Sequence, residues 1–296
     1  MKILLTGKNG QVGWELQRTL APLGDVVAVD RQALDLTSPD AIRALIREVK
    51  PNLIVNPAAY TAVDQAESEP EVAMAVNGTA PAIMAEEAKK LGAAMVHYST
   101  DYVFDGSKAT PYNELDATSP INVYGRTKLA GEQAVQATGI PHLILRTSWV
   151  YGNRGKNFLL TILRLAGERD ELKIVDDQIG APTSSRMIAE ITGQILAQCF
   201  SPIPHSPSLI DQYSGLYHLT AAGQTSWHGF SAAILENRVR LTGAPAPQLS
   251  QIQTSDYPLP APRPHYSVMS NNELKHAFGV AIPTWRNGLD LCMEEM

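Results

Sequence analysis

The chain has 296 residues, of which 44% are hydrophobic and 18% charged, and this composition is typical of a folded globular protein. Its net charge of -6 and isoelectric point near 5.7 argue against nucleic acid as a partner, because proteins that bind a phosphate backbone normally carry a basic face. A chain of this length is expected to form one large domain with an appended lobe, or two domains.

The first segment, Met1 to Leu5, predicts a short strand and is too short for the apolar core of a secretory signal. No run of the sequence reaches the roughly 18 apolar residues that a membrane-spanning helix needs. We therefore expect a cytoplasmic protein without a membrane partner.

A glycine-rich turn follows that strand directly. The turn has the spacing Gly7-x-x-Gly10-x-x-Gly13 and leads into an amphipathic helix from Trp14 to about Leu23. Glycines at a strand-to-helix turn let the backbone approach a pyrophosphate, and the helix N-terminus offers it unpaired N–H groups. The alternative is an ordinary tight turn. On the dinucleotide interpretation, the cofactor contacts here are Gly7, Asn9, Gly10, Gln11, Val12 and Gly13.

The second predicted strand, Asp25 to Val29, ends in Asp30-Arg31, where a βαβ dinucleotide fold presents the residues that meet the adenosine ribose. A carboxylate suits the free 2′-hydroxyl of NAD, whereas an arginine can take the 2′-phosphate of NADP, so both cofactors remain open. A solvated Asp-Arg pair is the alternative. Asp35-Leu36 is expected to flank the adenine.

The next elements repeat the alternation of helix and strand. A helix is predicted from Pro39 to Val49, a strand from Leu53 to Asn56, and a helical region from about Pro70 to Leu91. Small residues after the strand, in Ala58-Ala59-Tyr60, would let a cofactor lie against the backbone. Asn77 either braces the site or is a satisfied core residue. The alternation predicts a doubly wound parallel sheet of the Rossmann type.

An apolar strand from Ala93 to Tyr98 leads to Thr100, and a Tyr-x-x-x-Lys helix start follows at Tyr124 and Lys128. Four residues are about one helical turn, so the phenol and the ammonium project from one face. An ammonium beside a phenol is expected to draw the phenol pKa down from roughly 10, which suits a proton donor to a carbonyl. Alone, the pair can arise by chance, and Thr100 can simply end a strand.

Beyond Tyr151 the composition becomes more irregular. Helices are predicted at 158–169 and 185–199, with a strand at 174–177 between them. Two Pro-rich stretches, 201–215 and 243–265, predict an exposed loop and an extended crossing that could form a lid over the sheet edge. Arg263 in the second stretch is expected to bind a substrate diphosphate or to order the lid; a solvated arginine is the alternative.

The motifs together resemble the extended short-chain dehydrogenase/reductase superfamily, from Met1 to about Trp285. The motifs are Gly7-x-x-Gly10-x-x-Gly13, Ser99-Thr100-Asp101-Tyr102-Val103-Phe104-Asp105-Gly106 and Tyr124-Gly125-x-x-Lys128-x-x-x-Glu132. Later segments are similar to its rhamnose-forming reductases: Arg146-Thr147-Ser148-Trp149-Val150-Tyr151, Asn157-Phe158, Asp177-Gln178-x-Gly180-Ala181-Pro182-Thr183, Gly215-Leu216-Tyr217-His218-Leu219, Thr225-Ser226-Trp227 and Arg263-Pro264.

The resemblance implies reduction of the C4 carbonyl of dTDP-6-deoxy-L-lyxo-4-hexulose to dTDP-L-rhamnose, with NADPH as cofactor and NADH as a second possible donor. It implies a catalytic triad of Thr100, Tyr124 and Lys128, in which Tyr124 donates the proton and Lys128 also holds the nicotinamide ribose. It places the dTDP-sugar against Thr100, Asp101, Tyr102, Val103, Trp149 and Arg263. For Tyr102 a structural role is the alternative, and Arg146 can be an internal ion-pair partner.

The resemblance also implies a layout and partners. Residues 1–150 are expected to form the NAD(P)-binding domain and residues 151–296 mainly a smaller α/β nucleotide-sugar lobe, with segments near 174–200 and 217–242 crossing back. Some similar proteins hold a divalent ion between subunits through carboxylates. Glu15 occupies one such place here, but Arg186 stands where a second acid is expected, which argues against the metal. We therefore expect no metal site and a monomer or weak homodimer.

Two other functions remain open from the sequence. One is reduction or epimerisation of another nucleotide-sugar, which Tyr102, Trp149 and Arg263 would decide. The other is a non-catalytic regulatory subunit, like a relative that regulates methionine adenosyltransferase. An intact set of Thr100, Tyr124 and Lys128 argues against the second.

Overall fold

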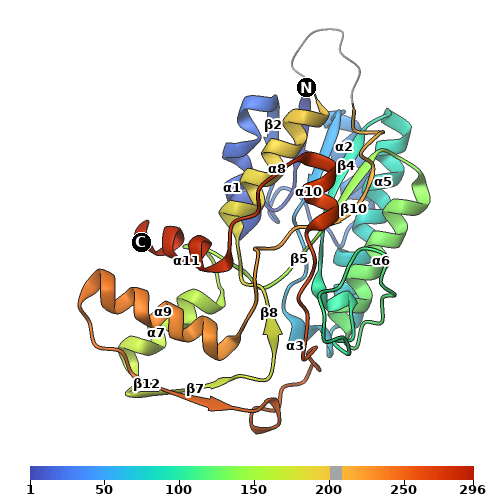
Figure 1. Ribbon diagram of the computed structural model, residues 1–296. Coiled ribbons are helices and arrows are strands. Elements are labelled where there is room, and N and C mark those ends of the chain that lie inside the picture. Colours follow the sequence, from blue (N-terminus) through green and yellow to red (C-terminus); the bar gives the residue numbers. More distant parts are fainter. Residues whose placement is uncertain (201–208) are drawn as a thin grey trace.

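A six-stranded parallel sheet forms the centre of the computed structural model, which describes residues 1–200 and 209–296 (Figure 1). The strand order is β10-β5-β4-β3-β1-β2. The strands are β1 (Lys2–Leu5), β2 (Asp25–Ala28), β3 (Leu53–Asn56), β4 (Ala94–Thr100), β5 (His142–Thr147) and β10 (Gly215–His218). The order reverses between β1 and β3, and open α/β sheets bind ligands outside the carboxyl ends of strands at such a switch point. The structure confirms the predicted doubly wound sheet.

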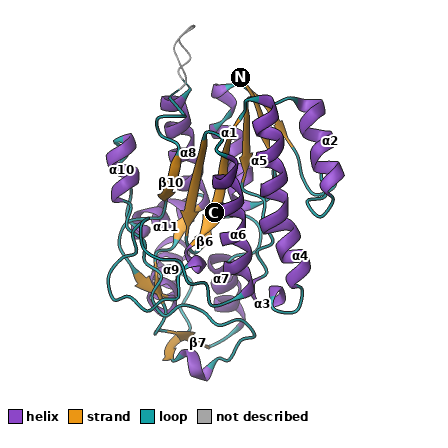
Figure 2. Ribbon diagram, turned by 90° about the vertical axis from the view of Figure 1, so that its right-hand side faces the viewer, coloured by secondary structure: helices purple, strands orange, loops and turns teal. Residues whose placement is uncertain are grey.

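Apolar side chains cover both faces of the sheet, which is why its strands are continuous hydrophobic runs. Ile3 and Leu5 point into one core cluster and Leu4 into the other. The first face is covered by α1 (Gln11–Thr19), α8 (Ser185–Cys199) and α10 (Asn272–Phe278). The second face is covered by α2 (Pro39–Val49), α5 (Ala80–Leu91) and α6 (Val123–Thr138), as Figure 2 shows.

A smaller lobe lies beyond the carboxyl ends of the sheet strands (Figure 1). It consists of α7 (Phe158–Glu168), α9 (Trp227–Thr242), α11 (Trp285–Glu294) and a parallel pair of strands, β7 (Glu171–Val175) and β12 (Gln248–Ile252). Its own core contains Leu159, Ile162, Phe230, Ile234 and Leu289. Chain segments alternate between the two bodies, because α8 and β10 belong to the sheet layers whereas β7 and α9 belong to the lobe.

Short elements connect these parts. They are η1 (Ala21–Leu23), α3 (Val63–Ala66), α4 (Pro70–Met74), η2 (Ala75–Thr79), η3 (Asp101–Val103), β6 (Val150–Tyr151), β8 (Ile179–Gly180), β9 (Thr183–Ser184), β11 (Thr225–Ser226) and η4 (Thr254–Asp256). Within the described ranges, no helix is long and apolar enough to cross a membrane.

Three segments differ from the sequence-based expectation. The strand predicted at 174–177 lies at 171–175, and the stretch 243–265, predicted as an extended crossing, contains β12 and η4. Pairing with β7 makes β12 a strand, and no local pattern encodes that pairing. The helix predicted at 70–91 is interrupted by the π-helical turn η2. The loop predicted at 201–215 lies partly outside the described residues.

Candidate active site

The glycine turn between β1 and α1 packs too tightly for larger residues. Gly7 has φ +61°, and a Cβ there would lie 3.1 Å from the Cα of Ala58. A Cβ on Gly13 would lie 2.1 Å from the carbonyl oxygen of Gly7. No side chain among the described residues caps the start of α1 at Gly10. The turn therefore combines close backbone approach with an uncapped helix N-terminus, which fits a pyrophosphate.

The carboxylate of Asp30 is fixed beside this turn. It accepts hydrogen bonds from the Asn9 side chain at 3.1 Å and from the Gln32 and Ala33 amides, and the Lys8 ammonium lies 3.4 Å away. The Ala33 amide contributes most to lowering the pKa of Asp30. Asp30 is therefore charged and oriented where a ribose hydroxyl would bind, with the cation of Lys8 next to it.

Asp35 and Leu36 have local structural partners. The Asp35 carboxylate accepts the Thr37 amide at 2.9 Å and the Thr37 hydroxyl at 2.8 Å, whereas Leu36 packs against the core on the α2 side. The two hydrogen bonds from Thr37 contribute most to lowering the pKa of Asp35, and the charge of Arg31 lowers it further. An adenine contact for these residues stays a prediction.

Asn77 holds the segment after β3 against α6. Its side-chain oxygen accepts the Tyr60 amide at 2.8 Å, and its nitrogen donates to the Tyr60 carbonyl at 3.1 Å and to the Thr127 hydroxyl at 3.2 Å. Asn77 lies in the π-helical turn η2, and such turns are frequent at functional sites. Asn77 is therefore a buried, fully hydrogen-bonded residue that fixes the backbone of Tyr60, and a role in bracing the site stays a prediction.

The start of α6 is fixed by residues that the sequence analysis missed. Asn122 accepts the Gly125 amide at 2.8 Å and donates to the Pro262 carbonyl at 2.8 Å, and Glu67 accepts the Val123 amide at 2.7 Å. The available signal was an N-cap asparagine directly before the Tyr-x-x-x-Lys helix. These bonds fix the helix turn that carries Tyr124.

Thr100, Tyr124 and Lys128 come together in a buried site. Thr100 ends β4, and Tyr124 and Lys128 are one turn apart in α6. Burial raises the pKa of Tyr124 to about 12, and a hydrogen bond with Thr100 only partly opposes this. Burial lowers the pKa of Lys128 to about 8, and the charge of Glu132 opposes the shift. The expected lowering of the Tyr124 pKa was therefore wrong for this structure, because the cost of burying a phenolate dominates. The Tyr124 phenol is therefore neutral near pH 7.

Asp101 and Tyr102 line this site. The Asp101 carboxylate accepts the Thr100 hydroxyl at 3.1 Å and the Ser148 hydroxyl at 2.8 Å, and burial raises its pKa to about 6. The Tyr102 ring packs edge-on against Tyr124 at 5.6 Å between centroids. The Val103 side chain is fully buried in an apolar cluster with Phe104, and a substrate contact for this residue stays a prediction.

Trp149 has an unusual backbone conformation. Its φ is +46°, and its indole stacks on Trp227 at 3.5 Å between centroids and 3° between planes. A Cβ on Gly180 would lie 2.4 Å from that indole. A non-glycine residue with positive φ is uncommon and is often found at functional sites. Trp227, which the sequence analysis did not assign to the site, therefore connects Trp149 to the smaller lobe.

Arg263 crosses from the 243–265 segment to α3. Its guanidinium forms two bonds to Asp64, at 2.8 and 3.0 Å, and it interacts with the Tyr102 phenol. The pKa of Asp64 is lowered chiefly by this pairing. Arg263 is thus an ion-pair partner that orders the segment beside Tyr102, rather than a solvated side chain; a diphosphate contact stays a prediction.

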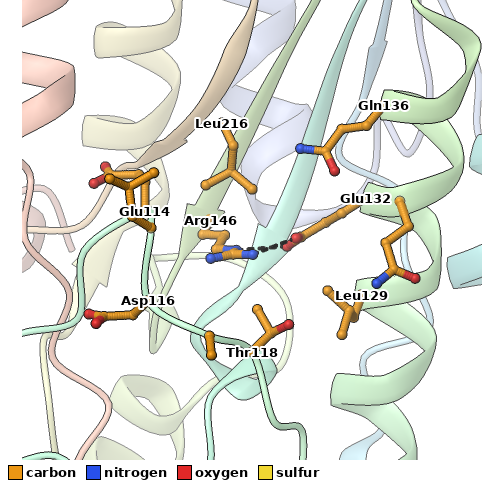
Figure 3. A pocket seen from close by; sticks show the side chains of 11 residues that line it. Glu114, Asp116, Thr118, Leu129, Glu132, Gln136, Arg146 and Leu216 are labelled. Carbon is orange, nitrogen blue, oxygen red and sulfur yellow. Dashed lines mark hydrogen bonds and ion pairs between the residues drawn. The ribbon is translucent and has the colours of Figure 1, made fainter.

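A pocket of about 470 Å³ is lined by residues of α6, of the 114–118 segment and of β5 and β10 (Figure 3). Arg146 forms a buried two-bond ion pair with Glu132 in it, at 2.7 and 2.9 Å. The sequence analysis considered an internal ion pair for Arg146, and this is that ion pair. Glu132 follows Lys128 by one turn, so the pair also places a negative charge near that ammonium.

The carboxylates around Glu15 surround an arginine. Arg186 lies 3.8 Å from Glu15 and 3.9 Å from Glu190, and it forms a short contact with Glu295. Within the described part of the chain, no group of three or more His, Cys, Asp or Glu side chains could hold a metal ion. The guanidinium supplies the positive charge at this cluster.

Comparisons with known proteins agree with this geometry. The family model of the RmlD substrate binding domain matches residues 1–296. The curated dTDP-4-dehydrorhamnose reductase of Burkholderia thailandensis is 50% identical over 100% of this chain and 99% of its own, and that of Escherichia coli K12 is 44% identical over 100% and 98%.

Solved structures show the same similarity. The dTDP-4-dehydrorhamnose reductase of Bacillus anthracis in complex with NADP has a TM-score of 0.89 at 34% identity, covering 100% of this chain and 99% of that one. The UDP-glucose 4-epimerase of Thermus thermophilus in complex with NAD has a TM-score of 0.78 at 19% identity, covering 99% and 98%, and shows the fold alone.

Proposed function

The chain belongs to the family of the RmlD substrate binding domain, and on that premise we propose which of its residues perform the family's reaction. It is an oxidoreductase that reduces the C4 carbonyl of dTDP-6-deoxy-L-lyxo-4-hexulose to dTDP-L-rhamnose. NADPH is the cofactor and supplies the hydride when bound. The observation that carries the assignment of residues is the hydrogen bond between the buried Thr100 and a neutral Tyr124, one helical turn before the buried Lys128.

In this proposal Tyr124 donates its phenolic proton to the oxygen that develops negative charge at C4. Its raised pKa keeps the proton on the phenol at neutral pH, so the donor is in the correct form. Thr100 donates a second hydrogen bond to the same oxygen. Lys128 places a positive charge near the phenol and favours the phenolate left after proton transfer.

Residues around the glycine turn bind the cofactor in this proposal. The cradle of Gly7, Gly10 and Gly13 holds the pyrophosphate, and Asp30 faces the adenosine ribose. Lys8 and Arg31 supply the positive charge that a 2′-phosphate needs. This charge supports NADPH as the donor, and NADH is an alternative donor of lower affinity.

The sugar nucleotide binds between the sheet edge and the smaller lobe in this proposal. Tyr102 and Trp149 pack against the sugar, and Asp101 orients Thr100 through their hydrogen bond. Arg263 orders the segment that covers the diphosphate. We further propose a cytoplasmic location and a monomer or weak homodimer.

The test is nicotinamide oxidation with the dTDP-linked 4-keto sugar, followed by absorbance for the wild type and Tyr124→Phe. Loss of the phenolic proton is expected to lower kcat by at least about 10²-fold while NADPH binding is kept. Titration of NADPH fluorescence checks that binding. Comparison of NADPH with NADH ranks the two donors.

The competing functions give other results. If the protein reduced a different nucleotide-sugar and not the dTDP-linked ketone, it would be another reductase. If it interconverted two nucleotide-sugars without net oxidation of the nicotinamide, it would be an epimerase. Wild-type protein that binds NADPH but turns over no sugar would support a regulatory role and refute the catalytic assignment.

A further inference from the structure

A buried row of polar side chains leads from β1 to the lysine of the active site. The Thr6 hydroxyl lies 2.6 Å from the Asn56 Oδ1, the Asn56 Nδ2 lies 3.2 Å from the His97 Nδ1, and the His97 Nε2 lies 3.4 Å from the Lys128 Nζ. All four side chains are at most 2% exposed. Thr6 follows β1, Asn56 ends β3 and His97 lies in β4, so the row crosses three neighbouring strands. Buried polar groups are costly unless each finds a partner.

His97 is one of two acceptors that face the Lys128 ammonium. The other is the Tyr98 carbonyl oxygen, 2.5 Å from Nζ. An ammonium has three donors and no acceptor, so His97 can bind it only through a bare Nε2 lone pair. Burial, and then the charge of Lys128, lower the pKa of His97 well below its usual value, so the ring is neutral and carries one proton. With Lys128 charged, that proton belongs on Nδ1.

Asn56 decides whether His97 can keep its proton there. An Nδ1–H needs the side-chain oxygen of Asn56 as acceptor, whereas a bare Nδ1 accepts from the Asn56 amide nitrogen. The structure has the amide nitrogen of Asn56 facing Nδ1 and its oxygen accepting from the Thr6 hydroxyl, which is the second arrangement. A half-turn of the amide, whose oxygen and nitrogen are alike in shape, gives the first. The Thr6 hydroxyl serves both, because it can donate to the oxygen or accept from the nitrogen. A charged Lys128 therefore goes with His97 protonated on Nδ1, and a neutral Lys128 goes with His97 protonated on Nε2.

We propose that His97 is a positioning residue that accepts a hydrogen bond from the Lys128 ammonium and keeps that lysine charged and in place, with the Asn56 amide turned so that its oxygen accepts the Nδ1 proton. This rests on the proposed role of Lys128. It explains why a histidine stands in the middle of the fully buried strand β4, where it touches no reacting atom.

The other titratable groups near Lys128 do not replace His97 as its hydrogen-bond acceptor. Glu132, one turn further along α6, favours the ammonium but binds Arg146 of β5 with both oxygens. Tyr124 on the same helix is neutral. His97 and the Tyr98 carbonyl are thus the direct acceptors of Lys128 among the described residues.

The test compares His97→Asn with His97→Gln. The glutamine side chain is long enough to put its oxygen near the position of Nε2, which faces Lys128, whereas asparagine reaches only the position of Nδ1, which faces Asn56. Glutamine therefore keeps an acceptor for Lys128, and asparagine does not. The pH profile of kcat is measured for each by nicotinamide oxidation. Thr192→Val is the stability control, because it removes a buried hydrogen bond with the Tyr98 hydroxyl on α8.

In the pH profile of kcat, we expect the alkaline decline of His97→Asn to lie about one pH unit lower than that of the wild type. One unit corresponds to a tenfold change in the protonation equilibrium of Lys128. Loss of an acceptor destabilises the ammonium, so Lys128 loses its proton at lower pH. His97→Gln should keep the alkaline decline of the wild type. Thr192→Val should lower the Tm without moving the alkaline decline. An unmoved alkaline decline in His97→Asn, or an equal shift in both His97 variants, would overturn the proposal.

Two measurements on the chain without substrate separate this inference from the proposed function. The 15N shifts of the His97 ring in wild-type protein at pH 6 report its tautomer, and an Nε2–H tautomer would refute the proposal even if no variant folded. The 13Cε shift of Lys128, titrated in wild type and both variants, reports its pKa directly. If the wild type turned over no sugar but these shifts behaved as expected, the proposed function would fail and the role of His97 would stand.

Discussion

At the scale of single residues, burial controls the chemistry of the active site. The same desolvation raises the pKa of Tyr124 and lowers that of Lys128, so each departs from its usual value in the direction of the neutral form. A neutral phenol can donate a proton, and Thr100 is hydrogen-bonded to it. The site is thus prepared for donating a proton to an oxyanion.

Thr100→Val should lower kcat by about 10²- to 10³-fold, because it removes one of two donors to the developing oxyanion. Thr100→Ser is the matched control, since it keeps the hydroxyl and should lose much less activity. Steady-state kinetics with NADPH at saturation measures both. Equal losses in the two variants would contradict the proposed role of the hydroxyl, because Thr100→Ser keeps it.

Asp101 should make stability depend on pH between about 4 and 6. Burial raises its pKa from 3.8 to about 6, so its folded form prefers the proton. Its contribution to the free energy of unfolding is therefore fully present below about pH 4 and is lost as the pH rises through 6. The effect is on the order of 3 kcal/mol. Urea unfolding of wild type and Asp101→Asn should show a free-energy difference that moves in favour of the variant over this range. A constant difference would contradict the raised pKa.

At the scale of elements, the site depends on contacts between segments far apart in sequence. Asn122 connects the start of α6 to Pro262, and Arg263 connects the same segment to α3. Trp149, after β5, stacks on Trp227 at the start of α9. The smaller lobe is therefore joined to the catalytic helix and to the predicted sugar contact by a few side chains.

Gly180→Ala should displace Trp149, because the new Cβ would lie 2.4 Å from the indole ring. We expect an approximately tenfold higher KM for the sugar nucleotide with NADPH binding unchanged, as for a lost aromatic contact. Gly167→Ala is the matched control: that glycine lies in α7 with no heavy atom within 4 Å of a built Cβ. The control should be as stable as wild type or slightly more so. An unchanged KM in Gly180→Ala would show that Trp149 does not contribute to sugar binding.

At the scale of the whole molecule, Arg186 joins the two bodies of the chain. It extends from α8 toward Glu15 of α1 and contacts Glu295, just after α11 of the smaller lobe. The guanidinium balances carboxylates that would otherwise repel one another. The cluster connects the lobe to the sheet layers.

Arg186→Gln should lower the Tm by a few degrees, and by more at low ionic strength, because the carboxylates then repel one another with less screening. A chelator should change neither the Tm nor the activity of the wild type. Thermal unfolding at two salt concentrations, with and without chelator, measures these effects. A lower Tm of wild type in chelator would show that a metal contributes.

Local patterns predicted most of the fold. Apolar runs predicted the strands, as for Leu53 to Asn56, and caps and periodicity predicted helices such as Pro39 to Val49. β12 escaped prediction because its stability comes from pairing with β7 across many intervening residues. The π-helical turn at Asn77 escaped because a helical pattern does not encode an extra residue in one turn.

The sequence by itself determined the alternation of strands and helices that is typical of a parallel sheet, the glycine turn and the spacing of Tyr124 and Lys128, because each of these patterns is formed by near neighbours in the chain. The tertiary structure alone decided the raised pKa of Tyr124, the buried position of Val103, the Trp149–Trp227 stack and the row from Thr6 to Lys128. These features depend on burial and on pairs of side chains from distant segments. Chain folding brings those groups together, and no local pattern records which of them meet.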